Sequence, residues 1–246
     1  MWLAALWGGI SGSAVLLGAL FALYLKIPKK LIGFIMAFGT GVLIGAATFE
    51  LVGESVRKGG LEPTSIGFFA GAVVFTVFDW YVSKKGGANR KRSDGRSSDV
   101  SGDKAGGLGI FIGTVIDAVP ESIMIGASLI TGAGVSMLLV IAIFISNIPE
   151  GLSSTVGLKN GGYSRTKILG LWAVVLLISA LASLGGYLFM ENAGEYATAI
   201  IASFAGGGIM AMIASTMLPE AYDEGGPVIG LMAALGLLAS LILDHL

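Results

Sequence analysis

Two short runs of polar residues lie inside strongly apolar segments of the chain. The first is 117–121 (Asp-Ala-Val-Pro-Glu) and the second is 146–150 (Ser-Asn-Ile-Pro-Glu). A charged residue at the centre of a membrane helix costs about 2.5–3.5 kcal/mol on insertion scales. Two such segments, each with a carboxylate next to a proline, therefore favour a cation-binding site over a purely structural role.

The spacing within each run places the polar side chains together on one face of a helix. Asp117 and Glu121 are four residues apart, while Ser146 and Asn147 precede Glu150 by four and three residues. Carboxylate, amide and hydroxyl oxygens are the ligands that suit hard divalent cations. These five residues are our candidate metal ligands.

The two prolines each free a backbone carbonyl oxygen near the candidate ligands. Pro120 has no N–H for the carbonyl of Ile116, and Pro149 has none for the carbonyl of Ile145. Such carbonyls are tolerated in a membrane where they line a wet cavity. The alternative is that both prolines only kink their helices and that Asp117 pairs with a polar neighbour. The repeated spacing, with no basic residue inside any expected helix, favours the metal site.

The composition is that of an integral membrane protein. Of the 246 residues, 54% are hydrophobic and 13% are charged, and the mean hydropathy is +0.86. Soluble domains carry about 25% charged residues. The chain has no cysteine, which excludes disulfides and thiolate metal sites, and its single histidine is the penultimate residue, His245. A net charge of -1 gives no indication of nucleic-acid binding.

Eight segments are long and apolar enough to cross a bilayer, which requires about 20 residues each. The sequence thus predicts an all-α protein with eight transmembrane helices. The expected spans are Trp2–Leu25, Leu31–Val52, Thr64–Val82, Leu108–Ile130, Gly134–Val156, Ile168–Met190, Ala197–Leu218 and Val228–Leu243.

The basic residues predict the orientation of these helices. All of the 15 Lys and Arg residues except Arg57 and Lys58 fall on one side of the expected topology. The positive-inside rule makes that side cytoplasmic, so both termini are expected outside the cytoplasm. The polar segment 83–107 is expected to be a flexible cytoplasmic loop between helices 1–3 (residues 1–82) and helices 4–8 (residues 108–246).

Other polar positions are weaker candidates. Glu220 stands near two further acids at the expected end of the seventh span, where we expect solvated helix-end charges more than cation ligands. Ser154 and Thr155 are expected to return hydrogen bonds to their own helix. Glu50 and Glu54 lie one turn apart near the outer end of the second span.

The two polar runs resemble the metal-binding motifs of the ZIP (ZRT/IRT-like) family of metal transporters. The fifth-helix motif of that family is Gln/His-Asn/Asp-x-Pro-Glu-Gly, and residues 146–151 match it at every position except the first. Residues 117–122 keep the Pro-Glu centre of the fourth-helix motif His-Asn-x-Pro-Glu-Gly but have Asp, Ala and Ser at its other fixed positions. The resemblance extends to eight helices, outside termini and a variable loop after the third helix.

The resemblance implies a 3+2+3 arrangement with a metal centre on the fourth and fifth helices, often with two metal ions. Carried over, Asp117, Glu121, Ser146 and Glu150 would line one site, and Asn147 with the two glutamates would line the other. Ala118 stands where the family has an asparagine ligand, and the sixth span offers only Ser183 in its corresponding stretch. The second site is therefore depleted. Family likeness favours zinc, with iron, manganese or cadmium as further cargo, whereas an all-oxygen ligand set favours harder ions.

The function expected from these features is transport of a divalent metal into the cytoplasm across the cell membrane by alternating access. A dication moving inward through about 100 mV gains roughly 4.6 kcal/mol, which supports about a thousandfold accumulation without a coupled ion. No prosthetic group is expected, and the partners are the metal ion and the lipid bilayer, with a homodimer left open.

Three other functions compete with transport of a divalent metal. A metal sensor that has lost transport and a transporter of another cation both remain open. An intramembrane aspartyl protease using Asp79 and Asp117 is disfavoured, because the chain has no Gly-x-Gly-Asp motif.

Overall fold

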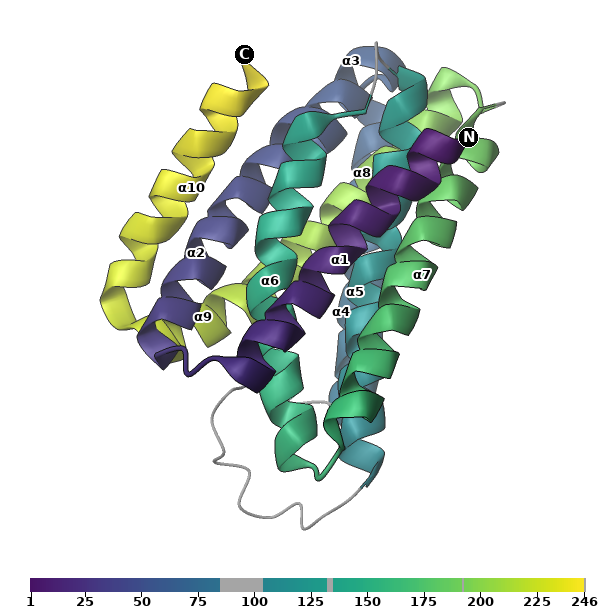
Figure 1. Cartoon of the computed structure of the whole chain (residues 1–246). Coiled ribbons are helices and arrows are strands. Elements are labelled where there is room, and N and C mark those ends of the chain that lie inside the picture. Colours follow the sequence, from purple (N-terminus) through teal and green to yellow (C-terminus); the bar gives the residue numbers. More distant parts are fainter. Residues whose placement is uncertain (85–103, 132–134, 192, 246) are drawn as a thin grey trace.

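The computed structural model describes residues 1–84, 104–131, 135–191 and 193–245, and the described chain is all helix and turn. Figure 1 shows long helices running side by side, with both termini at the end of the molecule where α3 lies. The helices and their bounds are α1 (Trp2–Tyr24), α2 (Lys29–Ala46), η1 (Ala47–Gly53), α3 (Glu54–Gly59), α4 (Leu61–Lys84), α5 (Lys104–Thr131), α6 (Met137–Asn160), α7 (Arg165–Met190), α8 (Glu195–Met212), η3 (Ile213–Met217), α9 (Leu218–Gly225), η4 (Gly226–Val228) and α10 (Ile229–Asp244).

Seven uninterrupted helical stretches of the described chain are long and apolar enough to cross a membrane. The last of them, Glu195–Asp244, has 50 residues, and a straight helix of that length would be about 75 Å long, far more than a bilayer needs. The chain reverses inside this stretch at Gly226, whose φ of 70° lies in the left-handed region open to glycine. Consequently α10 returns alongside α2 (Figure 1). The protein is a multi-pass membrane protein.

The helices begin and end close to the predicted bounds, with one difference. The second helix does not stop at Val52, because η1 and α3 continue it as one stretch to Gly59. The prolines at 120 and 149 do not interrupt α5 or α6, each of which is continuous. Neighbouring helices and local adjustments satisfy the backbone groups that a proline frees in a membrane.

Most of the predicted loop 83–107 lies outside the described residues. Within the described part, helix continues to Lys84 in α4 and starts again at Lys104 in α5.

The helices pack as two bundles, which we call the first and second bundle. The first bundle contains α1, α5, α6 and α7, and the second contains α2, α3, α4, α8, α9 and α10. Within each bundle the backbones approach closely at glycines, as is usual in membranes. A Cβ at Gly151 would collide with the backbone of Val15 between α6 and α1, and a Cβ at Gly71 would collide with the backbone of Phe204 between α4 and α8.

The two bundles meet mainly along α2 and α6. Gly39 of α2 lies against Ser146 of α6, where an ideal Cβ would be 3.1 Å from the Ser146 Cα. At the end opposite the termini, the Arg165 guanidinium lies 5.6 Å from the Tyr24 ring centroid, so the end of α1 neighbours the start of α7. The basic residues of these two segments therefore share one end of the molecule, as the topology prediction requires.

Candidate metal site

Helix α5 supplies two buried carboxylates from consecutive turns. The side chains of Asp117 and Glu121 are 3% and 1% exposed, and Pro120 lies between them within the continuous helix. Such burial is exceptional for acidic residues, which are almost never fully buried unless they have a partner. This face of α5 is therefore specialised for charge inside an otherwise apolar helix.

Helix α6 supplies the other three candidate ligands, and all of them are buried. Ser146, Asn147 and Glu150 are at most 4% exposed. The Ser146 hydroxyl donates to the Ile143 carbonyl of its own helix at 3.0 Å. Because a hydroxyl oxygen keeps its acceptor lone pairs when it donates, this bond leaves Ser146 able to ligate a cation.

The structure brings the two ligand-bearing helices into contact, since α5 and α6 pack against each other. Asp117 also lines a cavity of about 90 Å³ between α4, α5 and α8. Across the described ranges, no group of three or more His, Asp or Glu side chains is close enough to hold one metal ion. The gathering of all five ligands around an ion thus stays a prediction.

Glu220 is a fourth buried acid, besides Asp117, Glu121 and Glu150. The prediction of a solvated helix-end charge is wrong for this residue, which is 4% exposed. Its carboxylate accepts a hydrogen bond from the Ser153 hydroxyl, which lies three residues after Glu150 on α6. The Leu218-Pro219-Glu220 sequence repeats the Pro-Glu pairing of the other two sites, and that repeat was the signal available from sequence.

Thr155 also differs from expectation. Its hydroxyl oxygen accepts a hydrogen bond of 2.8 Å from the indole N–H of Trp172, which is completely buried on α7. A buried indole N–H needs an acceptor, so Thr155 joins α6 to α7 within the first bundle.

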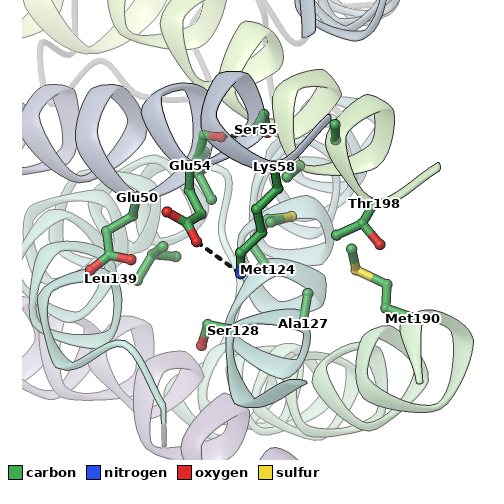
Figure 2. A pocket seen from close by; sticks show the side chains of 13 residues that line it. Glu50, Glu54, Ser55, Lys58, Met124, Ala127, Ser128, Leu139, Met190 and Thr198 are labelled. Carbon is green, nitrogen blue, oxygen red and sulfur yellow. Dashed lines mark hydrogen bonds and ion pairs between the residues drawn. The ribbon is translucent and has the colours of Figure 1, made fainter. Parts of the chain in front are cut away.

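A small pocket lies beside α3, at the end of the molecule where both termini lie, and one turn beyond Glu121 on α5. Figure 2 shows Glu50, Glu54 and Lys58 pointing into it from η1 and α3, opposite Ser128 and Met124 of α5. Its volume of about 30 Å³ is enough to hold a water molecule.

An ion pair lies in this pocket, which we call the mouth. The Lys58 ammonium lies 2.8 Å from one Glu54 oxygen, and the Arg57 guanidinium lies 2.6 Å from the other. Lys58 and Glu54 are about three-quarters buried, whereas the Arg57 side chain is 74% exposed. The two basic residues on the expected outer side therefore neutralise an acid at the mouth.

Comparison with known proteins finds distant similarity to zinc transporters. A protein provisionally named as a zinc transporter in Arabidopsis thaliana is 25% identical over 215 residues, which are 86% of this chain and 33% of that protein. A zinc transporter of Canis lupus familiaris is 25% identical over 129 residues, which are 50% of this chain and 28% of the relative. The protein zntB of Dictyostelium discoideum is 32% identical over 69 residues, which are 28% of this chain and 18% of that protein.

The chain thus matches a third or less of the length of each of these relatives. No protein-family profile matches the chain. The two zinc transporters are transport proteins and not enzymes, and the match to the plant protein extends over most of this chain. The chain is a distant homologue of the zinc transporters of the ZIP family.

Proposed function

We propose that this protein carries divalent metal ions, with zinc as the first candidate, across a membrane by alternating access. The observation that carries the proposal is the burial of five oxygen-bearing side chains on two contacting helices of a membrane protein. These are Asp117, Glu121, Ser146, Asn147 and Glu150. Intramembrane carboxylates are costly and commonly mark ion pathways.

In this proposal the ion moves between the first and second bundles. Glycine contacts hold the helices of each bundle together at backbone distance, as between Gly126 of α5 and Ser183 of α7. Cavities lie along the boundary between the bundles where α5 faces α8, whereas Gly39 of α2 packs closely against Ser146 of α6 elsewhere on this boundary. Rigid bodies separated by a loosely filled boundary can slide past each other, which would expose the ligands to each side in turn.

The finer features of the proposal follow from the sequence. Eight helices cross the membrane, both termini lie outside the cytoplasm, and the ion travels inward across the cell membrane. The mouth beside Glu54 would be the outer access point, and Glu220, one turn past Glu150, would lie on the cytoplasmic route. A membrane potential that is negative inside favours this direction for a dication.

The proposal is tested by measuring the flux of metal ions into proteoliposomes, with zinc, manganese, ferrous iron and magnesium compared. We expect saturable uptake of at least one metal, lost when Glu121→Gln and Glu150→Gln are combined, because both changes keep the side-chain size and remove the charge. The matched control is Glu62→Gln on the exposed first turn of α4. Wild-type protein that is folded and yet carries none of these metals would contradict transport.

A metal sensor without transport is the second candidate. Asp117 and Ala118, which stand where the fourth-helix motif has His and Asn, permit it. Calorimetry of metal binding, combined with the flux measurement, separates the two functions. A sensor would bind metal through Glu121 and Glu150 and still show no flux.

A further inference from the structure

A long apolar furrow runs between α5, α7 and α8. It has a volume of about 490 Å³ and is lined by residues of both bundles. Among the lining residues are Val119 and Ile123 of α5, Gly185 and Phe189 of α7, and Ile201 and Phe204 of α8.

The furrow is chemically suited to hydrocarbon. Its lining consists of Val, Pro, Ile, Met, Ala, Gly and Phe residues, so no lining side chain offers a hydrogen-bonding group. A buried water needs two to four polar partners, whereas an apolar cavity of about 150 Å³ stays dry and binds benzene. The furrow is about three times that size and falls within the usual range of ligand pockets.

The furrow opens on the membrane-facing surface of the protein. Phe189 at its edge is 72% exposed and belongs to the membrane-crossing helix α7. Gly185, one turn further inside α7, also lines the furrow and is exposed, so the opening extends along the apolar membrane-crossing span. We propose that an acyl chain of a membrane lipid occupies the furrow as a bound ligand, inserted between the two bundles.

The location gives such a chain a role in the movement of the bundles. The walls of the furrow belong to α5 and α7 of the first bundle and to α8 of the second. Pro120, which lines the furrow, directly precedes the buried Glu121. The furrow shares Pro120, Phe204 and Ala205 with the cavity that Asp117 lines. An inserted chain would fill the boundary that must shear during alternating access. This coupling rests on the proposed function, but occupancy of the furrow does not.

Two glycines of α7 provide a matched test. A Cβ at Gly185 or at Gly170 meets nothing within 4 Å, so a larger side chain fits at both positions. Both glycines are exposed on α7, but Gly185 lines the furrow. Gly185→Phe should fill the furrow, while Gly170→Phe should add the same side chain to the same helix elsewhere.

The experiment uses full-length protein in vesicles containing phosphatidylcholine with a photoactivatable diazirine in its acyl chain. After illumination, labelling of residues 182–189 and 201–205 is compared by mass spectrometry with labelling of the exposed α10 residues Leu231, Leu235 and Leu238. We expect wild type and Gly170→Phe to label the furrow severalfold above α10, and Gly185→Phe to lose this excess. Ala182→Leu, a smaller change in the same wall, gives a second test should the phenylalanine variant misfold.

Labelling of the furrow no greater than that of α10, or unchanged by Gly185→Phe and Ala182→Leu, would show an ordinary lipid shell and overturn the proposal. Zinc flux in the same vesicles separates this result from the proposed function. A protein that labels as expected without carrying metal keeps the lipid site and loses the transport proposal. Metal flux without specific labelling keeps the transport proposal and overturns the lipid site.

Discussion

The Ser153 hydroxyl of α6 donates a hydrogen bond to the Glu220 carboxylate of α9. This contact joins the first bundle to the second at a point one turn beyond Glu150. Both residues are buried, at 0% and 4% exposure, so the bond forms in surroundings where a lost donor cannot be replaced easily by water.

Ser153→Ala should therefore destabilise the protein. Hydrogen bonds to charged groups contribute about 1.5–3 kcal/mol, and the variant should show a lower melting temperature in detergent. The control is Ser13→Ala, because the Ser13 hydroxyl donates only to the Ile10 carbonyl of its own helix. Equal melting temperatures for the two variants would mean that the Ser153–Glu220 contact does not stabilise this arrangement.

Cross-linking should distinguish movement between the bundles from movement within one. The chain has no native cysteine, so paired cysteines can be introduced without background. Gly39→Cys with Ile145→Cys links α2 to α6, where an ideal Cβ at Gly39 lies 3.2 Å from a methyl carbon of Ile145. We expect oxidation to stop metal flux and a reductant to restore it, because this disulfide would tie the two bundles together.

The matched cross-link lies within the first bundle. An ideal Cβ at Gly9 of α1 is 3.8 Å from the Cβ of Ala180 on α7, which is the usual separation in a disulfide. Oxidised Gly9→Cys with Ala180→Cys should transport normally. Loss of flux in this variant, or full flux in the oxidised Gly39–Ile145 variant, would contradict movement of the bundles as rigid bodies.

The glycine contacts within a bundle should be intolerant of larger side chains. Gly151→Val places side-chain atoms against the Val15 backbone, and overpacking of this kind typically costs about 1–3 kcal/mol. We expect a lower melting temperature and less folded protein on size-exclusion chromatography. Gly170→Val, at an open position of α7, should behave like wild type. Unchanged melting of Gly151→Val would show that α1 and α6 can separate at no cost.

Removal of the Lys58 charge should strengthen metal capture at the mouth. Lys58→Gln leaves Glu54 with Arg57 alone, so the local potential becomes more negative and attracts a dication. Since ion pairs of this kind are worth up to about 1 kcal/mol, the KM for metal should fall by up to about fivefold. The decrease should shrink only partly as salt is added, because partly buried charges are screened less than exposed ones.

Arg57→Gln is the comparison, because this side chain also pairs with Glu54 but is largely exposed. Its effect on KM should be smaller than that of Lys58→Gln. An unchanged KM in Lys58→Gln at low salt would show that metal does not pass through this mouth.

The sequence by itself determined the helices and the candidate ligands. Apolar length is a local property, so most spans could be read within a few residues of the observed helix bounds, whereas the continuation of the second helix to Gly59 could not. Helical spacing likewise placed Asp117 with Glu121 on one face, and the i, i+3 and i, i+4 positions of Arg57 and Lys58 relative to Glu54 suffice for their ion pairs.

Only the tertiary structure decided which helices enclose the remaining groups. Glu220 is 67 residues from its partner Ser153, and Thr155 accepts from Trp172 on another helix, so neither burial nor partner follows from local pattern. The furrow beside Pro120 likewise exists because α8 of one bundle stands apart from α5 and α7 of the other. Helix packing in lipid depends on close contacts among small residues from distant segments. Because the chain is so uniformly apolar, each helix has several faces that could pack against a neighbouring helix. Which of these faces is buried is fixed only by the contacts between helices in the assembled bundles.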